Sequence, residues 1–147
     1  MPVAWIMMLG LIVAIGPLSI DMYLPALPTM AEDFGVSTAR ISNSVPAYFV
    51  GLVFGQLIYG PLSDRVGRVK PLYFGMTLYV IASLICATTD SEYVLFAART
   101  LQALGACVGA VVTRAAIRDT LPPRQMAKAF SIMVLVMGLA PILAPSM

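Results

Sequence analysis

The sequence predicts an all-α protein that lies in a membrane, and three observations support this fold class. Of its 147 residues, 60% are hydrophobic and only 11% are charged, whereas an ordinary soluble domain has about 25% charged residues. The mean hydropathy is +0.92. Apolar runs of about 20 residues, the length of a membrane-spanning helix, recur along the chain. We therefore expect the lipid bilayer to surround most of the protein, and the net charge of +2 indicates no nucleic-acid surface.

The apolar runs between charged residues predict about five membrane-spanning helices. Their expected ranges within residues 1–147 are 3–24, 44–62, 71–89, 93–113 and 127–147. No Lys or Arg precedes the first run, so we interpret it as a retained helix rather than a signal peptide. The fifth run reaches the length of a span only if Met147 is counted, and we expect no soluble domain or linker after it.

The charged residues between these runs sort by sign. Seven of the nine Lys and Arg residues lie in the second and fourth connections, at 63–70 and 114–128. Positively charged connections usually face the cytoplasm. This pattern predicts that the N-terminus is cytoplasmic as well.

Asp21 lies near the end of the first run, with apolar residues on both sides. It shares one helical face with Gly10, Ala14 and Pro17, and such small residues predict a face that points into a helix bundle. A carboxylate inside a membrane indicates a substrate contact or a proton carrier. The alternative is that the helix ends near Ser19 and that Asp21 is solvated at the outer interface.

Two GxxxG patterns occur in the apolar runs, one in the second and one in the fourth. Their glycines are Gly51, Gly55, Gly105 and Gly109. Glycine lets two helix backbones approach closely, so we expect these positions to lie at helix interfaces.

A short turn between the second and third runs carries one carboxylate and three cations. Its charged residues are Asp64, Arg65, Arg68 and Lys70. We expect the second helix to end at Gly60 and Pro61. Asp64 is then expected to cap the next turn, and Gly67 to allow a tight reversal. The simplest interpretation of the cations is an anchor at the cytoplasmic surface.

Arg99 lies about six residues inside the fourth run, or ~9 Å along a helix. It shares a face with Gln102, and because a lone Arg facing lipid is costly, we expect this face to point inward. Asp21 and Arg99 would then lie at comparable depth, where a direct or water-bridged pairing is allowed. The alternatives are that Arg99 reaches the outer surface or has a structural role.

The fifth run contains Pro141 and Pro145. Each removes one backbone donor, so we expect a bend or a pivot there, the alternative being a kink without a transport role. The sequence has no His, and Cys86 and Cys107 lie in separate runs. No metal, other cofactor or enzyme activity is predicted, because no metal cluster, nucleophile–base set or phosphate-binding loop is recognisable.

These motifs together resemble the major facilitator superfamily. The pattern Gly60-x-Leu62-x-Asp64-Arg65-x-Gly67-Arg68 is similar to the loop that joins helices 2 and 3 of each half. Segments 19–28, 98–105, 114–119 and 140–145 resemble drug/proton antiporters of the bicyclomycin-resistance (Bcr/CflA) type. The resemblance implies a twelve-helix fold, of which residues 1–147 are an incomplete N-terminal half that needs the remaining C-terminal helices as its partner.

The resemblance also implies a function. It is proton-coupled efflux of small hydrophobic or cationic drug-like compounds across the bacterial inner membrane by alternating access, driven by the proton gradient. Asp21 would be the proton and cation site, and Arg99 and Gln102 would tune it. The cytoplasmic latch would consist of Gly60, Asp64, Arg65, Gly67 and Arg68. Alternatives are a metabolite transporter of the same superfamily and a fragment that does not transport.

Overall fold

The computed structural model describes residues 3–143, with side-chain surroundings for residues 4–138. Its elements are α1 (Val3–Asp21), η1 (Leu24–Ala26), α2 (Leu27–Asp33), α3 (Thr38–Ile41), α4 (Ser44–Val66), α5 (Val69–Thr88), α6 (Glu92–Thr120) and α7 (Pro123–Leu143). Nearly all of the described chain is helical, and this part contains no strand. The predicted all-α class is confirmed.

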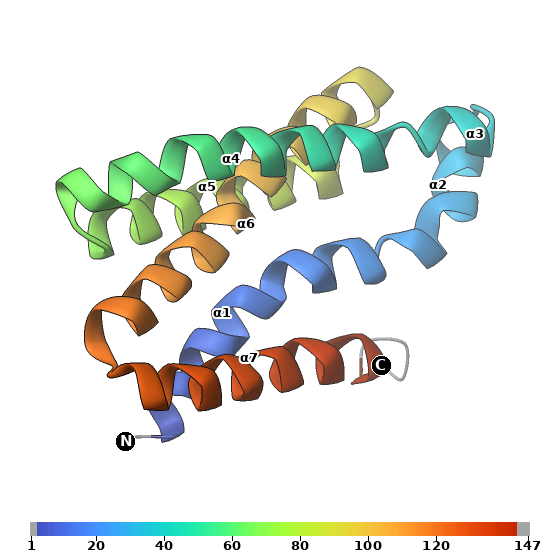
Figure 1. The fold of residues 1–147 in the computed structure, drawn as a ribbon. Helices are drawn as coiled ribbons and strands as arrows, with labels where there is room; N and C mark the ends of the chain where they lie inside the picture. The colour runs from blue at the N-terminus through green and yellow to red at the C-terminus, as the bar shows by residue number, and fades with distance from the viewer. Residues whose placement is uncertain (1–2, 144–147) are drawn as a thin grey trace.

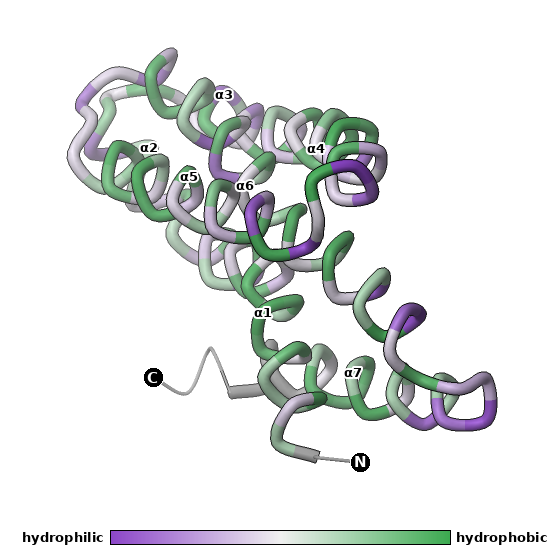
Figure 2. Tube along the Cα trace, turned by 90° about the vertical axis from the view of Figure 1, so that its left-hand side faces the viewer, coloured by the Kyte–Doolittle hydropathy of each residue, from purple (hydrophilic) through white to green (hydrophobic). Residues whose placement is uncertain are grey.

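Four helical segments within the described residues are long and apolar enough to cross a membrane. They are Ala4–Asp33, Thr38–Val66, Val69–Thr88 and Glu92–Thr120. Figure 2 shows hydrophobic residues along the long helices and hydrophilic residues gathered near several of their ends. The protein is therefore a multi-pass membrane protein. The expected fifth span corresponds to α7, which is not among these four segments and whose predicted last residues, 144–147, lie outside the described part.

The longest helix, α6, occupies the centre of the fold. In its most apolar stretch 56% of the residues are buried, against 28% or less in the other three spanning segments. It packs along α4 and α5 and also contacts α1, while α1 packs along α7 (Figure 1). Two groups of helices result, α4–α5–α6 and α1–α7, and α6 contacts both.

Glycines of α4 allow its close approach to α6. A Cβ atom added at Gly51 would lie 2.1 Å from the backbone oxygen of Thr100, and one at Gly55 would lie 2.8 Å from the Cβ of Cys107. The Thr100 hydroxyl donates to the backbone oxygen of Ala47 at 3.1 Å. The backbones of the two helices are therefore in contact along this stretch.

Glycines of α6 lie at its contacts with two other helices, α5 and α1. A Cβ at Gly105 would lie 2.6 Å from the backbone oxygen of Gly75 on α5. A Cβ at Gly109 would lie 2.8 Å from the backbone oxygen of Ile12 on α1. Both GxxxG glycines of α6 thus lie at interfaces, each with a different helix.

The prediction that the second helix ends at Gly60 and Pro61 is wrong. Helix α4 continues through Pro61 to Val66. The Ser63 hydroxyl donates to the backbone oxygen of Gly60 at 3.1 Å, beside the proline, and neighbouring helices let a membrane helix tolerate a proline. The reversal follows at Gly67, whose positive φ of 86° is the left-handed conformation that glycine adopts without strain.

Asp64 does not cap the following helix. It lies in the last turn of α4, while the residue before α5 is Arg68, which makes no side-chain capping bond. The fourth predicted helix also extends further than expected, to Thr120, because charged Arg side chains end an apolar run but are good helix formers.

The first predicted helix is interrupted after Asp21. Met22 and Tyr23 form a turn, and the chain then continues through η1 and α2. Prolines occupy the first positions of both short helices, where the missing backbone donor costs little. Asp21 is consequently the last residue of α1, at a break in the helical segment.

Candidate functional site

Arg99 is buried in the core of the fold and has only 4% of its surface exposed. Its Nη1 donates to the Oε1 of Gln102 at 2.7 Å and to the backbone oxygen of Ser19 at 3.4 Å. Its guanidinium carbon lies 3.3 Å from the centre of the Tyr23 ring and 5.7 Å from that of Tyr48. The cation is therefore held by an amide, a carbonyl and two aromatic rings.

Gln102 continues this polar contact from α6 to α5. It is 6% exposed, and its Nε2 donates to the Oγ of Ser83 at 2.8 Å. A second link joins α5 to α1, because the hydroxyls of Tyr79 and Ser19 lie 2.6 Å apart. The Ser19 hydroxyl also donates to the backbone oxygen of Ile15 at 2.7 Å.

Two tyrosines complete the network on the side of α4. The Tyr48 hydroxyl donates to the backbone oxygen of Gly16 at 3.2 Å. The hydroxyl of Tyr23 lies 2.6 Å from that of Ser44, which donates to the backbone oxygen of Ile41. Hydrogen bonds around Arg99 thus connect α1, α4, α5 and α6, and we call these side chains the Arg99 network.

Asp21 does not belong to the Arg99 network. The ion pairs among the described residues join Arg40 to Glu92, Arg68 to Asp64 and Arg68 to Asp119. The direct Asp21–Arg99 pairing that the sequence allows is therefore not formed in this structure. The Tyr23 ring and the carboxamide of Gln102 occupy positions next to the guanidinium instead.

Asp21 instead lines a cavity of about 310 Å³, which we call the Asp21 cavity. Its other polar side chains are Gln56 of α4 and Arg114 of α6. Its remaining lining is almost entirely apolar and comes from α1, α4, α6 and α7. The predicted face of α1 does point into the bundle, because Pro17 lines this cavity and a Cβ at Gly10 would meet Val136 of α7.

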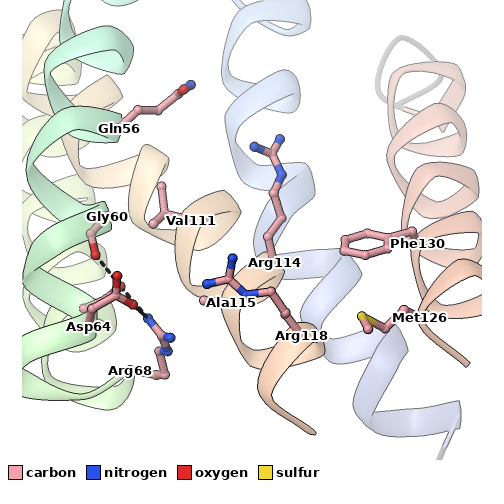
Figure 3. Close-up of a pocket in the computed structure, with 11 residues that line it drawn as sticks. Gln56, Gly60, Asp64, Arg68, Val111, Arg114, Ala115, Arg118, Met126 and Phe130 are labelled. Carbon is pink, nitrogen blue, oxygen red and sulfur yellow. Dashed lines mark hydrogen bonds and ion pairs between the residues drawn. The ribbon is translucent and has the colours of Figure 1, made fainter. Parts of the chain in front are cut away.

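A second cavity of about 400 Å³, the turn cavity, lies beside the turn between α4 and α5 (Figure 3). Gln56 and Arg114 line both cavities, which are therefore neighbours between α4 and α6. The turn cavity also contains Asp64, Arg68 and Arg118, and Phe130 of α7 projects toward it (Figure 3). Cations outnumber carboxylates here, so its potential is positive.

Arg68 is the centre of the charged junction beside the turn cavity. Its Nη1 donates to Asp64 at 2.6 Å and to the Ser63 hydroxyl at 2.8 Å. Its Nε and Nη2 contact Asp119 of α6 at 3.0 and 2.8 Å. This fork joins the end of α4, the turn and the end of α6. The Asp64 carboxylate, and then Asp119, raise the pKa of Arg68 above its usual range, so the residue stays charged at every working pH.

Replacing Arg68 with Ala should loosen this junction without unfolding the protein. Because the carboxylates are about half exposed, we expect a loss of about 1 kcal/mol or less. The backbone amides of residues 66–69 should exchange with deuterium about threefold faster or more, since they lose their link to α6. The measurement is hydrogen exchange by mass spectrometry.

Arg65→Ala is the matched control for this experiment. Arg65 is exposed and takes part in none of the ion pairs found between residues 3 and 143. Exchange in the turn should therefore remain at the wild-type rate. Equal acceleration in both variants would show that Arg68 holds no specific junction.

Several residues of these sites were not singled out from the sequence. They are Ser19, Tyr23, Tyr48, Gln56, Ser83, Arg114 and Asp119. Four of them, Ser19, Tyr23, Arg114 and Asp119, lie in segments that carry the family resemblance. Gln56 also carried a signal, because a polar side chain in the middle of a span indicates an interior face. Of the predicted pivot prolines, Pro141 lies within α7 and Pro145 lies outside the described residues.

No group of three potential metal ligands occurs among the described residues. Cys86 and Cys107 are free thiols on α5 and α6. At the other end of the bundle, Arg40 forms an ion pair with Glu92 and donates to the hydroxyl of Tyr93 at 3.3 Å. That contact ties α3 to the beginning of α6.

Comparison with known families gives one match over most of the chain. The family model described as Major Facilitator Superfamily matches residues 9–147. The match includes both cavities, the Arg99 network and the charged junction.

Individual relatives are similar over nearly the whole chain. The uncharacterized MFS-type transporter YdgK of Bacillus subtilis (strain 168) is 43% identical over 138 residues, 94% of this chain and 34% of the relative. Multidrug resistance protein D of Escherichia coli (strain K12) is 37% identical over 140 residues, 95% of this chain and 36% of the relative. Multidrug resistance protein MdtL of Shigella flexneri serotype 5b (strain 8401) is 37% identical over 134 residues, 91% of this chain and 34% of the relative. The chain thus spans about a third of the length of these relatives.

Proposed function

The chain belongs to the major facilitator superfamily, and from this premise we propose that the complete protein exports small drug-like molecules in exchange for protons. Its substrates would be hydrophobic or cationic, and its energy source the proton gradient. The relatives support transport rather than enzyme catalysis, since one is named a transporter and two are named multidrug resistance proteins. Within the superfamily we assign it to the drug/proton antiporters of the bicyclomycin-resistance type, on the motifs at 19–28 and 98–105.

The observation that carries the proposal is the environment of Asp21. This carboxylate lines a cavity of about 310 Å³ whose walls are mostly apolar. Binding sites for small organic molecules have this composition, with few polar groups on an apolar surface. A carboxylate in such a site binds either a proton or a cationic substrate, and competition between the two couples their transport.

The proposed cycle needs one proton and one substrate at Asp21. A cationic substrate binds from the cytoplasmic side and displaces the proton, which leaves to the cytoplasm. After the protein opens to the outside, a proton binds Asp21 and releases the substrate. The two halves of such transporters rock around a site near the midplane, so binding on one side excludes access from the other.

The Arg99 network gives this cycle a second component. Arg99 is held by Gln102 and Tyr23 and contacts no carboxylate among residues 4–138. We propose that Arg99 senses the charge of Asp21 through Tyr23, because Asp21 directly precedes the α1–η1 break in which Tyr23 lies. Protonation of Asp21 would thereby change how α1 packs on α6.

The charged junction has a separate role in the proposal. The positive charge of the α4–α5 and α6–α7 connections supports a cytoplasmic N-terminus in the bacterial inner membrane, with the α4–α5 turn on the same side. Asp64, Arg65 and Arg68 would hold that side closed against the rest of the protein during the outward-facing state, with Gly60 and Gly67 shaping the turn. Pro141 and Pro145 would shape a pivot in α7.

Substitution of Asp21 with Asn tests the proposal. In proteoliposomes containing the complete protein, drug-dependent proton release should fall about tenfold or more, because the amide cannot exchange a proton. Asp33→Asn is the matched control, since Asp33 is an exposed carboxylate of α2 outside the Asp21 cavity. Wild-type proton release in Asp21→Asn, or an equal loss in both variants, contradicts the assignment.

The same proteoliposomes also distinguish drug export from the alternative function, metabolite transport by a member of the same superfamily. Counterflow of a labelled metabolite without drug-dependent proton release would favour that function over drug export.

A further inference from the structure

The Asp21 cavity has opposite charges at its two ends. Asp21 is the last residue of α1, whereas Arg114 lies far along α6 and lines both the Asp21 cavity and the turn cavity (Figure 3). Gln56 is the other polar side chain of the lining. The middle of the cavity is apolar, with Val13, Ile20 and Leu52 among its walls.

The distance between the charged ends follows from the crossing of α1 and α6. A Cβ at Gly109 would touch Ile12, so these residues lie at one level. Asp21 is nine residues further along α1 and Arg114 five residues further along α6, and the two helices run in opposite directions (Figure 1). At ~1.5 Å per residue their backbones are separated by up to roughly 20 Å, which the two side chains shorten.

Within the described part of the chain, neither charge of the Asp21 cavity has an ion-pair partner. Asp21 and Arg114 take part in none of the ion pairs found among the described residues. The nearest cations of α6, Arg99 and Arg118, do not line the Asp21 cavity. Arg114 is exposed and Asp21 is half-buried in this structure. A ligand that fills the cavity covers both charges, so it is favoured when it supplies a partner at each end.

We infer that the Asp21 cavity selects zwitterionic substrates, with a protonated amine that binds Asp21, a carboxylate that binds Arg114 and an apolar body between them. The inference rests on the proposed transport function for the use of the site, and it names the substrate class. A molecule with only a cation leaves Arg114 unpaired, and a molecule with only an anion leaves Asp21 unpaired. A site built for both groups rejects analogues that lack one of them.

The test compares three molecules with one skeleton, using the complete protein in lipid nanodiscs. The zwitterion is 4′-(aminomethyl)biphenyl-4-carboxylic acid. Its methyl ester is the cation and its N-acetyl derivative is the anion. By calorimetry, wild-type protein should bind the zwitterion about tenfold more tightly, or better, than either single-charge analogue. Equal affinities for the three molecules would overturn the inference.

Variants of Asp21 and Arg114 test whether the preference for the zwitterion arises from these two charged ends of the cavity. Arg114→Gln should abolish the advantage of the zwitterion over the ester, whereas Arg114→Lys should retain it because the charge is kept. Asp21→Asn should abolish the advantage over the N-acetyl derivative. Arg118→Gln, which removes the same charge one turn further along α6, should keep both preferences. Loss of the preference in Arg118→Gln but not in Arg114→Gln would overturn the inference.

These experiments distinguish a failure of the substrate-class inference from a failure of the proposed transport function. A zwitterion preference without drug-dependent proton release supports the cavity assignment and contradicts the proposed function. Proton release driven by the ester, with no preference for the zwitterion in wild type, keeps the proposed function and overturns the inference.

Discussion

Gly51→Ala should destabilise the protein although it adds a single methyl group. The new Cβ would lie 2.1 Å from the backbone oxygen of Thr100, whereas ordinary contacts begin at 3.4 Å. A backbone carbonyl cannot rotate away, so α4 and α6 must separate. Overpacking of this kind costs about 1–3 kcal/mol, which exceeds the gain of up to ~1 kcal/mol in helix propensity when Ala replaces Gly. Thermal unfolding of the purified complete protein, followed by intrinsic fluorescence, measures the effect as a lower Tm.

Gly60→Ala provides the matched control on the same helix. A Cβ at Gly60 meets no atom within 4 Å, so the variant should keep the wild-type Tm or exceed it. The ratio of folded to aggregated protein on size-exclusion chromatography should separate the two variants in the same direction. An unchanged Tm in Gly51→Ala would contradict the contact between α4 and α6 at this level.

The helices could be predicted because each depends on local properties. Apolar runs of sufficient length located the spanning segments, and charged residues located their connections. Ends of helices were less predictable, because a charge ends an apolar run without ending the helix. Arg114 and Arg118 illustrate this, since α6 carries both beyond its expected end.

The error at Gly60 and Pro61 has a different physical cause. Both residues weaken a helix in isolation, yet α4 continues because it packs along α6. Packing between helices distant in the sequence outweighs the local preference. The reversal at Gly67 remained predictable because it depends on the conformation of one residue.

The contacts of the candidate site also differ in how well they could be predicted: those within one helix could be, and those between helices could not. Gln102 could be associated with Arg99 from helical spacing, and the two do form a hydrogen bond. The partners from other helices, Tyr23, Tyr48 and Ser83, could not be found because no local rule places them beside α6. The comparable depth of Asp21 and Arg99 allowed a direct pairing, whereas the structure places Asp21 in a cavity shared with Arg114.

Arg99→Met should remove proton coupling while the protein remains folded. Methionine keeps the apolar bulk, and the loss of a buried cation without a carboxylate partner offsets the lost contacts. Those contacts are the cation–π interaction with Tyr23, worth about 0.5–2 kcal/mol, and the hydrogen bond to Gln102, worth about 1–3 kcal/mol with its acceptor left unsatisfied. We expect drug-dependent proton release to fall about tenfold or more, as measured in proteoliposomes, with little change in Tm.

Two further variants separate charge from geometry at Arg99. Arg99→Lys keeps the charge but not the planar group that stacks on Tyr23, so we expect partial coupling between the wild-type and Arg99→Met values. Tyr23→Phe keeps the ring beneath the guanidinium and removes only the hydroxyl bonded to Ser44, so it should retain most of the coupling. If Arg99→Met releases protons at the wild-type rate, Arg99 acts only as a structural link between α1 and α6. If Tyr23→Phe loses coupling as completely as Arg99→Met, the Tyr23–Ser44 hydrogen bond rather than the stacked cation transmits the change at Asp21.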